Sequence, residues 1–126
     1  MANAAVPEQI HIAYTGVVGQ LSVDFVSSGS GSGTIAWGTT KGSLTSTNTT
    51  TSFSYPTIGY LHQGLMTFDV TVGQKAYYQV SAAGESSAVF EVTPVVGAVE
   101  RFAVFGDFGL KNDVCMNDLI QEAAGE

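Results

Sequence analysis

The chain has 126 residues, of which 44% are hydrophobic and only 12% are charged, a composition typical of a packed globular domain rather than a disordered chain. Its formal net charge is −7 and it holds only four Lys and Arg residues. It therefore lacks the basic surface that nucleic acid or an anionic membrane requires, and we expect neither as a partner. The length allows one complete domain and leaves little for a second.

The N-terminus and the cysteine content bear on export. Residues 1–7 have neither a basic start nor an apolar core, so we expect no signal peptide in this chain. Cys115 is the single cysteine, which excludes an intrachain disulfide. Asn48-Thr49-Thr50 is an N-glycosylation sequon, which makes Asn48 a candidate glycosylation site.

Short apolar runs separated by turn signals fill residues 8–93 and predict a β-sandwich of immunoglobulin or fibronectin type III kind. Alternation is clearest where Leu21, Val23 and Phe25 share one face of a strand. Trp37 is a ring large enough to fill the space between two sheets. The predicted strands cover 9–14, 20–26, 34–38, 65–72, 76–82 and 88–92, and a Thr- and Ser-rich stretch covers 43–54.

The two histidines and the adjacent tyrosines receive structural interpretations. His11 lies in mid-strand and is expected to face a sheet surface, and His62 is expected near the start of a strand. Neither histidine is spaced with another metal ligand, so both are predicted to be structural or solvated. Tyr77 and Tyr78 alternate along a strand, so one should be buried and the other exposed.

The character of the chain changes after residue 94. Residues 95–99 are typical of a linker, and four apolar residues, Phe102–Phe105, then run into Gly106-Asp107-Phe108-Gly109. An uninterrupted apolar run indicates a strand covered on both faces. A helix is predicted over 114–124, with Cys115 as a buried, unreactive thiol on its apolar stripe. A strand, turn and helix in this order open a βαβ unit, so residues 100–126 are predicted to be the truncated start of an α/β domain.

Asp107 is the one residue singled out for metal chemistry. A carboxylate at the carboxyl end of a first parallel strand lies where α/β sheets bind their ligands. From the residues alone, capping of the turn or of the following helix is the alternative role. No catalytic residue and no cofactor-binding residue is predicted elsewhere in the chain.

Five segments of the chain resemble the N-terminal part of the purple acid phosphatases, and they occur in the same order as in that family. The family carries similar Pro-Gln-Gln-Val/Ile-His, Trp-Gly-Thr, Tyr-Tyr-Tyr-x-Val and Gly-Asp-x-Gly runs. Val72 and Ala76 depart from the family, which often has Pro and Tyr there, and the family's later metal-site motifs have no counterpart in this chain. The segments are Pro7–Ile12, Val23–Val26, Ala36–Thr39, Lys75–Val80 and Phe102–Gly109.

The resemblance implies a fibronectin-like domain over 1–94, a linker over 95–99 and the start of a metallophosphoesterase domain over 100–126. It implies that Asp107 is a ligand of a binuclear centre, Fe with Zn, Mn or Fe, in a secreted parent enzyme that hydrolyses phosphate monoesters. This chain is then expected to be inactive, to bind no metal tightly by itself, and to have the missing remainder of the catalytic domain as its partner. The alternative is a stand-alone β-sandwich that serves as a binding or adhesion module.

Overall fold

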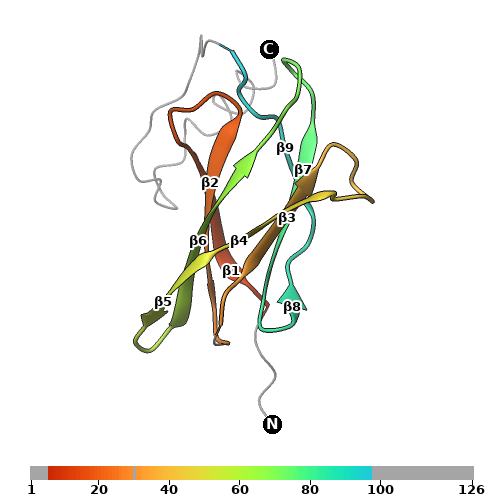
Figure 1. Ribbon diagram of the computed structural model, residues 1–126. Coiled ribbons are helices and arrows are strands. Elements are labelled where there is room, and N and C mark those ends of the chain that lie inside the picture. The colour runs from red at the N-terminus through yellow and green to blue at the C-terminus, as the bar shows by residue number, and fades with distance from the viewer. Residues whose placement is uncertain (1–5, 30, 98–126) are drawn as a thin grey trace, which may run out of the picture.

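The computed structural model describes residues 6–29 and 31–97, which form two antiparallel sheets packed face to face (Figure 1). The first sheet has the order β1-β2-β6-β5, from strands β1 (Glu8–Tyr14), β2 (Gln20–Ser27), β6 (Gly59–Thr67) and β5 (Thr51–Tyr55). The second sheet has the order β4-β3-β7, from β4 (Ser46–Thr49), β3 (Thr34–Gly38) and β7 (Ala76–Ala82), with β8 (Glu85–Ser86) and β9 (Phe90–Val92) both paired to β7. The predicted mostly-β fold with sandwich architecture is therefore confirmed for these residues.

The core lies between the inner faces of the two sheets. Successive side chains of a strand point to opposite faces, so alternating sequences place one apolar set inward. In β2 the residues predicted to share a face are all buried, and β7 alternates in the same way. Removal of such side chains from water is the main stabilising contribution to a fold of this kind. The buried apolar residues are Leu21, Val23, Phe25, Ile35, Met66, Phe68, Ala76, Tyr78, Val80 and Ala82.

The Thr- and Ser-rich stretch divides into two strands that belong to different sheets. β4 pairs with β3 in the second sheet, β5 pairs with β6 in the first, and Thr50 alone separates them. The crossing is held by the Thr50 amide, which donates a hydrogen bond to the Gly33 carbonyl at 2.9 Å. In Figure 1 the two strands form one band, yellow to olive, that closes this side of the sandwich. At the opposite side the first sheet ends in β1, and the second ends in β8 and β9, which both pair with β7.

Two hydrogen bonds between a side chain and the backbone connect further parts of the sandwich. The Trp37 indole Nε1–H of β3 donates to the Thr67 carbonyl at the end of β6, 2.9 Å away, and so links the two sheets. Ser87 fills the break between β8 and β9, where its hydroxyl accepts from the Val80 amide at 3.1 Å. Trp37 therefore has the position between sheets that its size predicted, with a polar contact as well.

The strand predicted over 65–72 is wrong in its bounds, because β6 runs over Gly59–Thr67. The hairpin from β5 turns at Gly59, whose φ of +126° favours glycine, and a Cβ there would lie 2.2 Å from the Ser27 carbonyl oxygen. The early half of β6 was missed because its inward residue is His62, a polar side chain that hides the apolar alternation. Pairing with β2 along Tyr60–Thr67 continues the strand through this histidine.

The described part of the predicted linker lies against the sandwich. The Val95 carbonyl accepts a hydrogen bond from the Gly19 amide at 3.2 Å, and Pro94 is buried. The predicted α/β start over 100–126 lies outside the described residues. Within 6–29 and 31–97 the structure contains no helix long and apolar enough to cross a membrane.

Candidate functional site

The residue predicted to bind metal, Asp107, lies outside the described residues, as does Cys115. Among the residues that the structure does describe, no three His, Cys, Asp or Glu side chains gather where they could hold a metal ion. The metal chemistry expected of Asp107 therefore stays a prediction. Two arrangements of polar side chains are defined by the structure, one buried and one on the surface.

The buried arrangement is centred on His62 and is called here the His62 cluster, made up of His62, Ser27, Thr50 and Ser52. The imidazole has no exposed surface. Its Nε2 lies 2.8 Å from Ser27 Oγ, and its Nδ1 lies 2.7 Å from Ser52 Oγ and 3.4 Å from Thr50 Oγ1. The ring stacks on Phe25 with centroids 4.7 Å apart. Each ring nitrogen therefore has a hydroxyl partner, as a buried histidine requires.

The geometry of the His62 cluster indicates a structural role. A serine beside a histidine is an arrangement that nucleophilic enzymes use, but they need the nucleophile open to substrate and the imidazole oriented by a third group. Among the described residues His62 is bonded only to hydroxyls, and Ser27 is buried with it. Burial lowers the pKa of His62 below its ordinary value of 6.5, which favours the neutral ring. Of the two predicted environments, structural or solvated, the structure shows the buried one, and this agrees with a structural role.

The surface arrangement is a transverse row of polar side chains on the outer face of the first sheet. The register places His11 of β1 opposite Asp24 of β2, Asp24 opposite Gln63 of β6, and Gln63 opposite Thr51 of β5. Val23 and Phe25, which flank Asp24, and His62, which precedes Gln63, are all buried, so the row points away from the core. His11 is exposed, as predicted.

A hollow of about 410 Å³ opens over three strands of this outer face and over the crossing from β4 to β5. It is called here the outer hollow. Its size lies in the range of sites that bind small molecules, about 300–1,000 Å³. It combines one carboxylate, two amides, several hydroxyls and one apolar side chain. The lining residues are Ser22, Asp24, Asn48, Thr49, Thr51, Gln63, Gly64 and Leu65.

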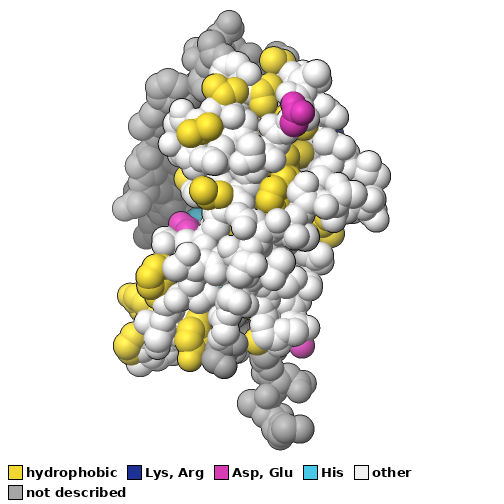
Figure 2. Space-filling model, in the orientation of Figure 1, with side chains coloured by type: hydrophobic (Ala, Val, Ile, Leu, Met, Phe, Trp, Pro, Cys, Tyr) yellow, Lys and Arg dark blue, Asp and Glu magenta, His cyan; other side chains and the backbone are white. Residues whose placement is uncertain are grey.

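Apolar side chains adjoin the transverse row. The next row along the sheet pairs Val26 with Leu61 and Leu61 with Phe53, and Phe53 is 49% exposed. Tyr55 follows two residues later on the same face and is 52% exposed. Figure 2 shows hydrophobic side chains gathered at the lower left of the molecule, at the end where the β5–β6 hairpin lies. The outer face of this sheet therefore changes from polar to aromatic along β5.

Asn48, the candidate glycosylation site, lies in β4 at the rim of the outer hollow. Its side chain is exposed, its Nδ2 donates to the Leu65 carbonyl at 3.2 Å, and its Oδ1 accepts from the Thr49 amide at 3.0 Å. The third sequon residue, Thr50, is buried in the His62 cluster. The sequon residues thus have a structural function in the crossing, and glycosylation stays a prediction.

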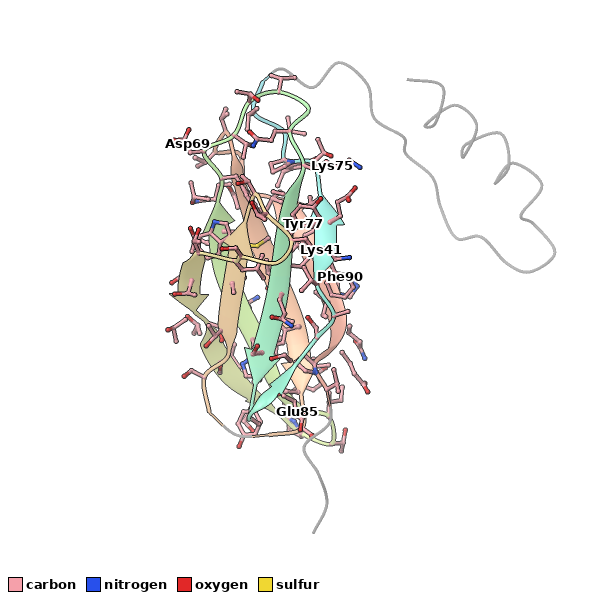
Figure 3. The ribbon with its side chains drawn as sticks, turned by 90° about the vertical axis from the view of Figure 1, so that its right-hand side faces the viewer. Lys41, Asp69, Lys75, Tyr77, Glu85 and Phe90 are labelled. Carbon is pink, nitrogen blue, oxygen red and sulfur yellow. The ribbon has the colours of Figure 1, made fainter. Side chains whose placement is uncertain are left out.

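The tyrosine pair behaves as its alternation predicted. Tyr78 is 7% exposed, packs on Phe90 with ring centroids 5.5 Å apart, and has a pKa raised by burial. Tyr77 lies on the outer side of β7, where Figure 3 shows it between the labelled residues Lys75 and Phe90. The outer hollow, in contrast, was missed at the sequence level. Its residues come from four strands and carry no motif, so only the order and register of the strands reveal it.

Comparisons with protein-family models, with curated proteins and with solved structures gave no match for this chain.

Proposed function

We propose that this chain is the non-catalytic N-terminal part of a two-metal phosphatase similar to the purple acid phosphatases. The observation that supports the proposal is the order of its parts. An all-β unit of two sheets, whose last described strand ends at Val92, is followed by the apolar run Phe102–Phe105 and by Gly106-Asp107-Phe108-Gly109. The sandwich accounts for the first part, and an uninterrupted apolar run is typical of the first strand of a layered α/β domain, the second part of the proposed parent.

In the proposed parent, Asp107 holds one ion of a binuclear centre and the remaining ligands come from later parts of the catalytic domain. Two adjacent metal ions supply a nucleophilic hydroxide and stabilise the charge that develops on a phosphate ester. One carboxylate does not bind a transition metal tightly, because such sites use four or more ligands. The role of the sandwich is therefore accessory, and the chain by itself is proposed to be inactive.

Two measurements test this proposal. The transcript that encodes the chain is read beyond the codon for Glu126, where Gly-Asp-x-x-Tyr and Gly-Asn-His-Glu are expected. The purified chain is assayed with p-nitrophenyl phosphate in the presence of Fe and Zn, and no turnover is expected. Turnover that disappears in Asp107→Asn would contradict the accessory role. A stop codon directly after Glu126 would contradict the proposed parent enzyme.

The second candidate function is a free-standing binding module, and the outer hollow is the observation that favours it. The two candidates differ in what they predict for residues 98–126. If these residues begin an incomplete domain, their apolar run lacks a cover, and the full chain associates while a chain ending at Gly97 stays monomeric. If they are an accessory tail, removal leaves both the oligomeric state and the thermal midpoint unchanged. Analytical ultracentrifugation of the two chains separates these outcomes.

A further inference from the structure

We propose that the outer hollow, together with Phe53, binds a neutral oligosaccharide. The proposal concerns the outer face of the first sheet only. It does not depend on the parent enzyme proposed above, since an accessory domain and a free-standing module would both carry this face. Three features of the face support it: unused hydrogen-bonding groups, adjacent apolar side chains and, among the described residues, a lining without Lys or Arg.

The hydrogen-bonding groups come from three neighbouring strands. Asp24, Gln63 and Thr51 lie side by side in the transverse row and all line the hollow. Within the described part of the chain none of these three side chains forms a hydrogen bond to the protein, whereas both polar atoms of the Asn48 side chain at the rim are already bonded. A carboxylate accepts, an amide both donates and accepts, and a hydroxyl does either. Such a set matches the adjacent hydroxyls of a sugar, each of which is also donor and acceptor.

The apolar side chains lie on both sides of these polar groups. Leu65 lines the hollow and is 42% exposed, and Phe53 follows Thr51 on the same face of β5. Two residues along a strand advance about 6.6 Å, which is close to the length of one sugar unit. A sugar ring presents C–H groups on its faces, and an aromatic ring is the side chain that packs best against them. A chain of two or three sugars therefore extends from the hollow over Phe53 toward Tyr55.

The charge of the face selects a neutral ligand over an anion. Asp24 is the only charged residue in the lining. The described residues include two cationic side chains, Lys41 and Lys75, and neither lines the hollow. Figure 3 shows both on the β7 and β9 side of the molecule, away from the first sheet. Lys75 is moreover paired with Glu91 at 3.0 Å. The lining therefore offers a phosphate, a sulfated glycan or a uronic acid no Lys or Arg, and the basic side chain of the transverse row is His11, which lies opposite the Asp24 carboxylate.

The test uses the full chain made in bacteria, so that Asn48 carries no glycan. Cellohexaose, laminarihexaose, xylohexaose and mannohexaose are titrated against the labelled protein while amide chemical shifts are followed, and heparin and polygalacturonate serve as anionic probes. We expect at least one neutral hexasaccharide to bind and to shift resonances of Asp24, Thr51 and Gln63. Asp24→Asn and Phe53→Ala should each weaken binding about tenfold, the effect of one lost contact of this kind.

Asp69→Asn is the matched control, because Asp69 is an exposed carboxylate outside the lining of the hollow (Figure 3). It should bind the sugar as the unmodified chain does, and thermal unfolding followed by circular dichroism should show that all variants fold. The proposal is overturned if no neutral hexasaccharide binds at about 10 mM, or if Asp24→Asn and Phe53→Ala bind as the control does. Binding of the anionic probes alone overturns it as well. So does self-association through Phe53 without sugar binding, which would identify a second copy as the occupant.

Discussion

The imidazole of His62 lies over the ring of Phe25, with centroids 4.7 Å apart and ring planes inclined by 20°. The two side chains come from β6 and β2, which pair Phe25 directly with His62 in their register. The contact buries a polar ring in the core, and the surrounding hydroxyls supply its hydrogen bonds. Because burial lowers the pKa of this histidine and so favours its neutral form, the stability of the sandwich becomes linked to pH.

We expect the stability to decrease as the pH falls below about 6.5. Burial lowers the pKa of His62 in the folded chain, so the unfolded chain binds more protons in this range. The contribution of the neutral ring is present above pH 6.5 and is lost at a rate of up to about 1.4 kcal/mol per pH unit as the pH falls toward the folded pKa. Urea unfolding at pH 5, 6 and 7 measures it. His11→Gln should keep this dependence, and His62→Gln should lose it.

Gly33→Ala should destabilise the chain by about 1–3 kcal/mol, because it overfills a packed site. A Cβ at this position would lie 2.7 Å from Phe25 Cζ, 2.9 Å from Thr50 Oγ1 and 3.1 Å from His62 Nδ1. Gly42→Ala is the control, since nothing lies within 4 Å of a Cβ there. Thermal and urea unfolding of the two variants should separate them clearly. Equal stabilities would show that the side chains around Gly33 rearrange to accept the added methyl group without lowering the free energy of unfolding.

Thr50→Val should lower the free energy of unfolding by about 1–3 kcal/mol, the cost of leaving a buried donor without a partner. Thr50 Oγ1 accepts from the Gly33 amide at 2.8 Å and lies 3.4 Å from His62 Nδ1. Valine keeps the branched shape and removes the hydroxyl. Thr50→Ser keeps the hydroxyl and the sequon, so it should retain most of the stability. If both variants unfold alike, the hydrogen bond that valine removes contributes no more to stability than the methyl group that serine removes.

Trp37→Phe should cost about 1 kcal/mol, the net value of one hydrogen bond. The variant keeps a ring between the sheets, where Trp37 meets Phe68 edge to face at 6.4 Å, but it loses the bond to the Thr67 carbonyl. Trp37 is the only tryptophan in the chain, so unfolding of the variant is followed by circular dichroism instead of fluorescence. An unchanged midpoint would show that water replaces the indole at the Thr67 carbonyl.

The ion pair between Lys75 and Glu91 is expected to contribute nothing measurable to stability. The side chains are 62% and 50% exposed and lie 3.0 Å apart, and exposed pairs of this kind are screened by solvent and salt. Glu91→Gln should therefore leave the unfolding midpoint unchanged in both low and high salt. A midpoint that drops in low salt only would indicate that the pair fixes β9 to β7.

The amino-acid sequence by itself predicted the β character of the described residues, the apolar face of β2, the presence of β7 and the turns between most strands. These features depend on a period of two and on local turn residues, so neighbouring residues are enough to predict them. The sequence also predicted that His11 faces a sheet surface and that Tyr77 and Tyr78 lie on opposite faces, but not which tyrosine is buried.

Only the tertiary structure decided which strands pair and in what register. Because of that pairing, β6 starts at Gly59 and not at residue 65 as predicted, and the Thr-rich stretch forms two strands separated by Thr50. The same pairing places hydroxyls from β2 and β5 around His62. It also assembled the outer hollow, whose Asp24 and Gln63 are far apart in the chain and adjacent in the sheet. The physical reason is that register is a property of two strands together, and no single strand carries it.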